Sequence, residues 1–368
     1  SLNNQKPAVF IDNLALLLSF AGTLLIIITP FSGQAHPIIN NYIPVLNDRL
    51  FMAGLIVIGL SFAIFSLRSL LYNQAPGLST PQDVLRFAIF LSVLTLVVTL
   101  FAQLASYLNL EQDRLDQTYY EYLFWGSGHS LQFSHTILLL VTWMWLSSVS
   151  GAQYRFKPAV YGVLFLLCFA PVLIVPVIYS SFPVLSPEHR INFTELMRWG
   201  GLSSLPLGLL VAIKVFNRSP IEASLRPVRI AFVSSVVLFA SGGVLGFMIE
   251  GINVVIPAHY HGSIVGVTLA FMGMSYLLLP LFGYQAPAGK WVNAQPVIYA
   301  TGQMMHIIGL AWSGGYGVQR KTAGTAQDLD SLERVIGMGM MGLGGLVAII
   351  GGTMFLIIVL MAIFKKRQ

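Results

Sequence analysis

The chain consists of long apolar stretches separated by short polar connections. The hydrocarbon core of a bilayer is about 30 Å thick, and roughly 20 apolar residues cross it as a helix. Because hydrocarbon offers no partner to peptide N–H and C=O groups, each crossing segment must satisfy them internally. The pattern therefore predicts an all-α, polytopic bundle of transmembrane helices. The ten predicted spans are residues 10–30, 50–72, 86–109, 123–149, 159–180, 195–217, 228–250, 258–284, 296–313 and 335–364.

Composition agrees with a location in membrane lipid. Of 368 residues, 56% are hydrophobic and 9% are charged, whereas about a quarter are charged in an ordinary soluble domain. The formal net charge of +6 does not indicate a nucleic-acid partner, because the basic residues are scattered between apolar stretches. We find no long linker, charged tail or internal repeat, which favours a single transmembrane domain over residues 1–368.

The distribution of Lys and Arg predicts the orientation of the spans, because cytoplasmic connections are enriched in these residues. Placing both termini inside assigns thirteen of the 20 basic residues to the inner face. We therefore expect both termini in the cytoplasm. The inner group comprises Lys6, Arg68, Arg86, Arg155, Lys157, Lys214, Arg218, Arg226, Arg229, Lys290, Lys365, Lys366 and Arg367.

The histidines gather toward the predicted outer side. His36 and His189 fall in outer connections, and the other five lie near the outer ends of spans or in the outer half. A polar side chain within a span is costly and marks a site by default, and imidazole is a common axial ligand of haem iron. The alternative is hydrogen bonding at the interface. The other five are His129, His135, His259, His261 and His306.

Four segments resemble subunit I of the haem-copper oxidase superfamily. They are FWGSGHSLQF, FTELMRWGGLSSLPLGLLVAIKVF, FASGGVLGFMIEGINVVIPAHYHGS and QMMHIIGLAWSGGYGVQRK, in the family's order. In that family W-x-x-G-H opens the sixth helix and H-x-H starts the tenth. The resemblance covers about residues 121–320 and relates residues 121–368 to helices six to twelve. Residues 1–120 then hold three divergent spans where the family has five helices, as if two N-terminal helices were missing.

The resemblance implies a set of ligands. His259 is similar to the axial ligand of the active-site haem, and His261 is similar to a ligand of a second, low-spin haem. Residues at i and i+2 of a helix point about 200° apart, so each imidazole must bind its own partner. His129 is similar to the first copper ligand, but Ile178 and Tyr179 stand where the family has a histidine pair. Because a lone imidazole makes a poor copper site, we do not expect copper.

Other positions also depart from the family pattern. Phe133 stands where many members have a redox-active tyrosine, and Leu131 stands where they have a proton-delivering glutamate. These departures favour a non-catalytic redox subunit. Arg320 and Lys321 follow the ninth span, where they could pair with haem propionates or form a solvated loop. Because the single cysteine, Cys168, rules out a CxxCH attachment, any haem is held non-covalently.

Three functional hypotheses follow. In the first, the chain carries one or two b-type haems and transfers electrons in a respiratory complex of a bacterial inner membrane, with an outer-side redox partner such as a cytochrome c. His259 and His129 then bind one iron from opposite faces, and His261 holds a second haem with His36, His135 or another subunit. In the second, the chain is the catalytic subunit of a terminal oxidase or nitric oxide reductase. In the third, it is a haem-free structural or assembly protein, since a fold does not determine a function.

Overall fold

The computed structural model describes residues 9–33, 36–38, 40–43, 45–72, 77–111, 115–217, 219–322 and 324–364. Some of the basic residues on which the predicted orientation rests lie outside the described residues. They are Lys6, Arg114, Arg218, Lys365, Lys366 and Arg367.

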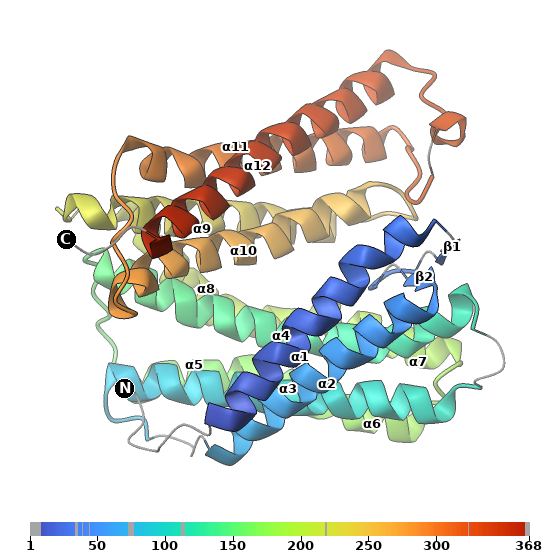
Figure 1. Ribbon diagram of the computed structural model, residues 1–368, viewed down its shortest axis with the longest axis horizontal. Helices are drawn as coiled ribbons and strands as arrows, with labels where there is room; N and C mark the ends of the chain where they lie inside the picture. The colour runs from blue at the N-terminus through green and yellow to red at the C-terminus, as the bar shows by residue number, and fades with distance from the viewer. Residues whose placement is uncertain are drawn as a thin grey trace. The chain divides into compact units, whose positions relative to one another are not determined.

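Each of the ten predicted spans coincides with a helix or with a run of consecutive helices (Figure 1). The predicted all-α class is confirmed. The first four spans are single helices: α1 (Val9–Ile28), α2 (Arg49–Tyr72), α3 (Pro81–Asn109) and α4 (Gln117–Val149). The fifth span is a run of α5 (Pro158–Phe169), η2 (Ala170–Ile174) and α6 (Val175–Ser181). The sixth span is a run of α7 (Pro187–Glu195), η3 (Leu196–Gly200), η4 (Gly201–Ser204), α8 (Leu205–Ala212) and η5 (Ile213–Phe216). The other four are η6 (Ala223–Leu225) with α9 (Arg226–Phe247), α10 (Val255–Leu281), α11 (Lys290–Gly315) and α12 (Leu332–Phe364).

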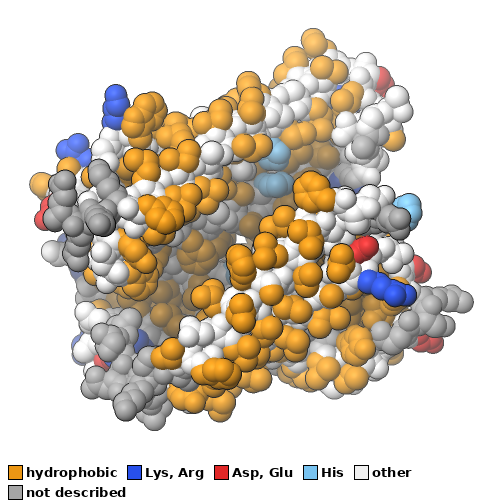
Figure 2. All heavy atoms as spheres, viewed as in Figure 1, with side chains coloured by type: hydrophobic (Ala, Val, Ile, Leu, Met, Phe, Trp, Pro, Cys, Tyr) orange, Lys and Arg blue, Asp and Glu red, His pale blue; other side chains and the backbone are white. Residues whose placement is uncertain are grey.

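Eight of these helical segments are long and apolar enough to cross a membrane by length and composition. The two others, α4 and α11, are also long, but polar residues interrupt their apolar sequence. Both of them carry histidines, at positions 129 and 135 of α4 and 306 of α11. In Figure 2, hydrophobic side chains cover the sides of the visible helices, as lipid-facing surfaces require. The chain is an integral membrane protein.

The chain divides into two compact units, each described here by itself. The first comprises residues 1–138 and 156–207, and the second comprises residues 139–155 and 208–368. The prediction of one domain over residues 1–368 stays a prediction.

In the first unit, α1 and α2 approach each other at Gly22 and Gly54. A Cβ atom on Gly22 would lie 2.8 Å from the carbonyl oxygen of Gly54, so only glycine permits this contact. The guanidinium of Arg68 forms an ion pair with Asp12 at 2.8 Å and joins the same two helices. Between α1 and α2 the chain forms a two-stranded antiparallel hairpin, β1 (His36–Ile38) and β2 (Val45–Asn47), a small addition to the helical pattern.

The hairpin packs against the beginning of α4. Val45 of β2 shares a buried cluster with residues of α2, α4 and the connection that follows α6. This packing brings the loop between the strands to the histidine-containing part of α4. The buried members are Val45, Phe51, Leu110, Tyr119, Tyr120, Leu123 and Val184.

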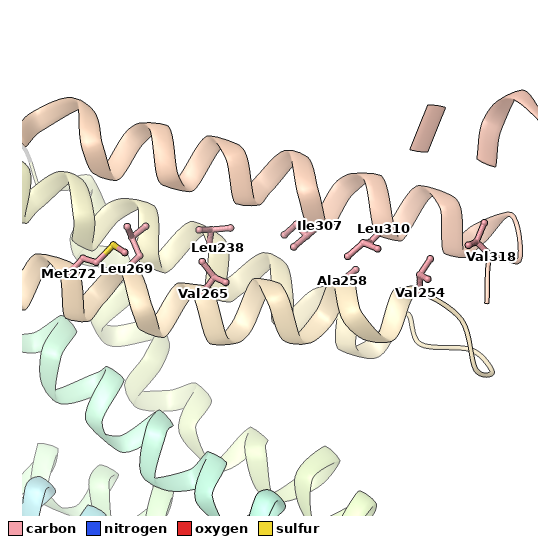
Figure 3. Packing of buried hydrophobic residues seen from close by; sticks show 9 residues of the cluster. All are labelled: Leu238, Val254, Ala258, Val265, Leu269, Met272, Ile307, Leu310 and Val318. Carbon is pink, nitrogen blue, oxygen red and sulfur yellow. The ribbon is translucent and has the colours of Figure 1, made fainter. Parts of the chain in front are cut away.

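In the second unit, α9, α10 and α11 enclose an apolar cluster (Figure 3). Helices α9 and α10 approach closely where Gly242 meets Gly262, since a Cβ on Gly262 would lie 2.6 Å from the Cα of Gly242. Small residues permit such approach between membrane helices, where packing drives association. The cluster consists of Leu238, Val254, Ala258, Val265, Leu269, Met272, Ile307, Leu310 and Val318.

The glycines of the last span pack that helix against α11. A Cβ on Gly344 would lie 2.4 Å from the backbone nitrogen of His306, and a Cβ on Gly302 would lie 2.4 Å from the backbone nitrogen of Ala348. The small-residue spacing of GMGMMGLGGLVAIIGG therefore serves close packing against a neighbouring helix, α11.

We expect Gly344→Leu to lower the thermal stability of the purified protein, because the added side chain meets the backbone of α11. Overpacking of this kind costs about 1–3 kcal/mol. Gly342→Leu on the same helix is the matched control, since nothing lies within 4 Å of a Cβ atom there. Equal melting temperatures of the two variants in detergent would contradict the packing described here.

Candidate functional site

His259 is held against α9 by a single hydrogen bond. Its Nδ1 lies 2.7 Å from the carbonyl oxygen of Gly242. A carbonyl oxygen only accepts, so Nδ1 carries the proton and Nε2 keeps a free lone pair. Gly246, one turn further along α9, leaves room for the ring, because a Cβ there would lie 2.7 Å from Nδ1. This is the arrangement by which a second group orients a metal-binding histidine.

His261 points to a different helix. Its ring contacts that of His306 on α11, with centroids 4.8 Å apart and planes at 71°. The Nδ1 of His306 lies 2.9 Å from the carbonyl oxygen of Met341 on α12 and therefore donates to it. The two imidazoles of the H-x-H segment thus face different neighbours, as a separation of about 200° requires.

The segment after α11 brings Arg320 to the beginning of α10. The backbone nitrogen of Val254 donates to the carbonyl of Val318 at 3.0 Å, and Asn253 pairs with Gln319 in an isolated bridge. Arg320 interacts electrostatically with Tyr260, which stands between the two histidines of H-x-H. The guanidinium is therefore near the segment that the sequence predicts to bind haem. Lys321 is exposed and has a φ of 60°.

His129 lies in the first unit, buried in a cage of aromatic side chains. Its ring centroid is 4.6 Å from that of Trp125, 5.4 Å from that of Tyr42 and 5.8 Å from that of Phe193. Its Nδ1 lies 2.7 Å from the carbonyl oxygen of Trp125 and 2.8 Å from the hydroxyl of Tyr42. Both contacts involve Nδ1, which leaves Nε2 as the nitrogen available to a ligand.

The hairpin loop positions Tyr42 against His129. Asn40 accepts hydrogen bonds from the backbone nitrogens of Tyr42 and Ile43 at 3.2 and 3.1 Å. Burial raises the pKa of the Tyr42 phenol above its usual value, and the hydrogen bond from Gln132 acts in the opposite direction. Gly128 makes the contact possible, because a Cβ there would lie 2.4 Å from the Tyr42 ring.

Glu121 joins the loop to the other side of the cage. It accepts hydrogen bonds from the backbone nitrogen of Asn41, at 2.9 Å, and from the side-chain amide of the same residue. Its carboxylate is 4.0 Å from the guanidinium of Arg190, which lies over the Trp125 ring at 4.6 Å from the centroid. The indole nitrogen of Trp125 donates to the carbonyl of Arg190 at 3.2 Å. This network fixes the outer wall of the His129 cage.

His189 is not in a connection, and that prediction was wrong. It lies in α7 and is fully buried. Ser186 caps the helix by accepting from the backbone nitrogen of His189 at 3.1 Å, and Pro187 occupies the first position, so the helix begins eight residues before the predicted span. Ser-Pro before a polar residue is the sequence signal that would have found it.

The ring of His189 packs between Tyr179 and Phe193, at centroid distances of 4.9 and 5.0 Å. Neither ring nitrogen has a hydrogen-bond partner among the described residues, although the backbone of Phe182 lies nearby. Because Phe193 also contacts His129, the same phenylalanine borders both histidines. Sequence reasoning did not select His189 as a site residue.

The resemblance predicts that Tyr179 stands at one of the positions where the family has a copper-ligating histidine. Its hydroxyl lies 2.9 Å from the carbonyl oxygen of Ala102 and 2.7 Å from the hydroxyl of Ser106. Gly126 of the FWGSGH segment accommodates this side chain, because a Cβ there would overlap the Tyr179 hydroxyl. The neighbouring Ile178 is buried.

The two remaining histidines stand apart from these groups. His135 is exposed on α4, and His36 is exposed in β1, paired across the hairpin with Asn47. The predictions that they supply a haem ligand stay predictions. The prediction that His129 and His259 bind one iron also stays a prediction.

The family model for cytochrome c and quinol oxidase polypeptide I matches residues 3–354. The chain belongs to this family, the haem-copper oxidase subunit I proteins. Its members bind haem and work with other subunits in membrane oxidase complexes. An uncharacterized protein of Rickettsia prowazekii (strain Madrid E) is 29% identical over 385 residues, which cover 93% of this chain and 74% of that protein. An uncharacterized protein of Aquifex aeolicus (strain VF5) is 25% identical over 297 residues, which cover 79% and 71%.

We expect Tyr42 of this subunit I protein to remain neutral in the folded state well above the pH at which free tyrosine ionises. The difference in absorbance at 295 nm between the wild type and Tyr42→Phe should stay at zero up to about pH 11, since an unperturbed tyrosine titrates near pH 10. In guanidinium-unfolded protein the difference should appear near that ordinary value. A tyrosinate signal from Tyr42 at pH 10 in the folded protein would contradict its burial.

Proposed function

We propose that this chain binds a b-type haem through Nε2 of His259 and acts as an electron-transfer subunit of a respiratory complex in a bacterial inner membrane. The observation that carries the proposal is the hydrogen bond from Nδ1 of His259 to the Gly242 carbonyl. It fixes the tautomer with a free Nε2, as an axial haem ligand requires. Membership of a haem-binding family supplies the cofactor class.

The residues around His259 fit a haem. Gly246 leaves room for the imidazole itself against α9, and the Gly242–Gly262 contact holds α9 and α10 at the distance that the hydrogen bond needs. Arg320, near Tyr260, is a guanidinium that suits a carboxylate such as a propionate. A haem held by His259 would supply one-electron redox chemistry at this position. His261 is the proposed ligand of a second haem.

The donor set near His129 supports a protein without the family's copper. The two positions of the family's histidine pair hold Ile178, which has no donor, and Tyr179, whose hydroxyl is already bonded to α3. Copper sites of two or three imidazoles need more nitrogen donors than His129 alone.

The proposal includes partners. Other family members function with further subunits, so we expect companion subunits in the membrane. The predicted orientation puts the beginning of α10, with His259 and Arg320, at the outer face. An outer-side redox protein such as a cytochrome c is therefore the proposed electron partner.

The test is the reduced-minus-oxidised spectrum of the purified protein with haem and copper quantified per chain. We expect a low-spin b-type spectrum that carbon monoxide does not shift. In His259→Gly the haem spectrum should be lost, and added imidazole should restore it by replacing the missing ligand. Ile264→Ala on the same helix is the matched control, because that side chain is exposed, carries no donor atom and should leave the spectrum unchanged.

Haem content unchanged in His259→Gly would contradict the assignment of the ligand. A colourless wild-type protein, purified under conditions that retain porphyrin, would overturn the haem function altogether. His129→Ala tests the predicted sixth ligand separately, since its removal should open the iron to carbon monoxide and leave the haem bound.

A second candidate function is an oxygen or nitric oxide reductase with an unusual second metal. The observation that favours it is His189, whose two buried ring nitrogens have no partner among the described residues and whose neighbour Phe193 also borders His129. Metal analysis decides between the candidates. Stoichiometric copper that disappears in both His129→Leu and His189→Leu would favour the reductase. A protein with haem and without copper supports the electron carrier.

A further inference from the structure

The second unit contains a cavity of about 470 Å³ at the beginnings of two helices. Arg226 and Arg229 come from the first turn of α9, and Asn293 comes from the first turn of α11. Ser219 completes the polar lining, and the remaining residues are one proline and two isoleucines. The cavity therefore has a basic, hydrogen-bonding side and an apolar side.

The positive charge at this cavity is not compensated by the described protein. The first turn of α9 holds two arginines and no acidic residue, although the beginning of a helix already carries a partial positive charge. The first turn of α11, which starts at Lys290, also lacks an acidic residue. Neither Arg226 nor Arg229 takes part in an ion pair among the residues with described coordinates. An anion would stabilise this arrangement.

Hydrogen bonds within the protein fix the position of the Arg229 guanidinium without a ligand. Its Nη2 donates to the carbonyl oxygens of Ser150 and Ser219 at 2.5 and 2.6 Å. Asn217 holds the same connection, because its side chain donates to Ser150 and accepts from Ser219. The Nε of Arg229 and the Oδ1 of Asn293 are buried and have no hydrogen-bond partner in the described part of the chain. The guanidinium thus has an unused donor at a fixed position.

The residues around the cavity indicate which kind of molecule carries the anion. Phe216, which ends the helical run before the cavity, is 72% exposed, and Trp291, beside Asn293, is 64% exposed. Exposed aromatic residues next to basic residues are typical of the boundary between hydrocarbon and lipid headgroups. Basic pockets between membrane helices on the cytoplasmic side bind anionic headgroups, and the predicted orientation places this cavity on that side.

We propose that this cavity binds a phosphate group, and that the group is the headgroup phosphate of an anionic phospholipid. Arg226 and Arg229 bind the phosphate oxygens, Asn293 provides a further polar contact, and the acyl chains lie against the exposed apolar residues next to the cavity. The site is separate from the haem function proposed above and does not depend on it.

The test uses the full-length chain, purified and delipidated in a neutral detergent. Its melting temperature is measured against increasing phosphatidylglycerol, phosphatidylcholine and inorganic phosphate. We expect saturable stabilisation by phosphatidylglycerol only. Arg226→Gln should weaken the apparent affinity several-fold, and Arg226→Gln with Arg229→Gln should weaken it by more than about tenfold, since each basic group near an anionic lipid contributes about 1 kcal/mol.

Arg155→Gln with Lys157→Gln is the matched control, because it removes two exposed basic residues that do not line the cavity. Arg229 bonds to the backbone of Ser150 and Ser219, so its replacement could prevent folding. In that case the single variant Arg226→Gln still decides the test, because Arg226 is exposed. Equal stabilisation by phosphatidylcholine, or an unchanged affinity in Arg226→Gln, would overturn the site. Equal stabilisation by inorganic phosphate would overturn the lipid as the source of the phosphate.

Discussion

A peptide group in hydrocarbon has no water to bond with, and this constraint determines the architecture of the chain. It requires helices through each apolar stretch, and it requires polar side chains to find partners within the protein. Gln295 of α11, fully buried, donates to the carbonyl of Gly351 at 3.1 Å and accepts from the Tyr276 hydroxyl at 2.9 Å. Where two helices must come close enough for such bonds, glycine replaces larger residues, as at Gly242 and Gly262.

The same constraint gives three histidines a defined tautomer. His259, His306 and His129 each place Nδ1 within hydrogen-bond distance of a backbone carbonyl, on α9, on α12 and within α4 respectively. Since a carbonyl only accepts, each ring presents Nε2 to its surroundings. For His259 the carbonyl is available because α9 carries glycines at 242 and 246, so the helix behind the histidine matters as much as the histidine itself.

The aromatic cage in the first unit contains the side chains on which the proposal about copper rests. Tyr179, which the resemblance predicts to stand at one of the copper-ligand positions, bonds to α3 through its hydroxyl. A different histidine, His189, is buried beside Tyr179, and it belongs to α7, whereas Tyr179 belongs to α6. The proposed replacement of an imidazole by a phenol would alter the donor set around His129 and leave the helical framework unchanged. It is consistent with a family fold that serves another function.

The sequence alone determined the helices, because the length of each apolar stretch can be counted along the chain and a stretch long enough to cross the hydrocarbon core must form a helix. It also identified the H-x-H segment and the W-x-x-G-H segment, since their spacing is recognisable along the chain. It did not reveal that the hairpin places Tyr42 on His129, that Arg320 returns to the beginning of α10, or that His189 is buried. The contacts responsible join residues that are 87, 66 and 10 positions apart, respectively Tyr42 with His129, Gln319 with Asn253 and His189 with Tyr179. Only tertiary packing decided them, because hydrogen bonds and ring contacts depend on which helix faces which, and no periodicity in the sequence encodes that choice.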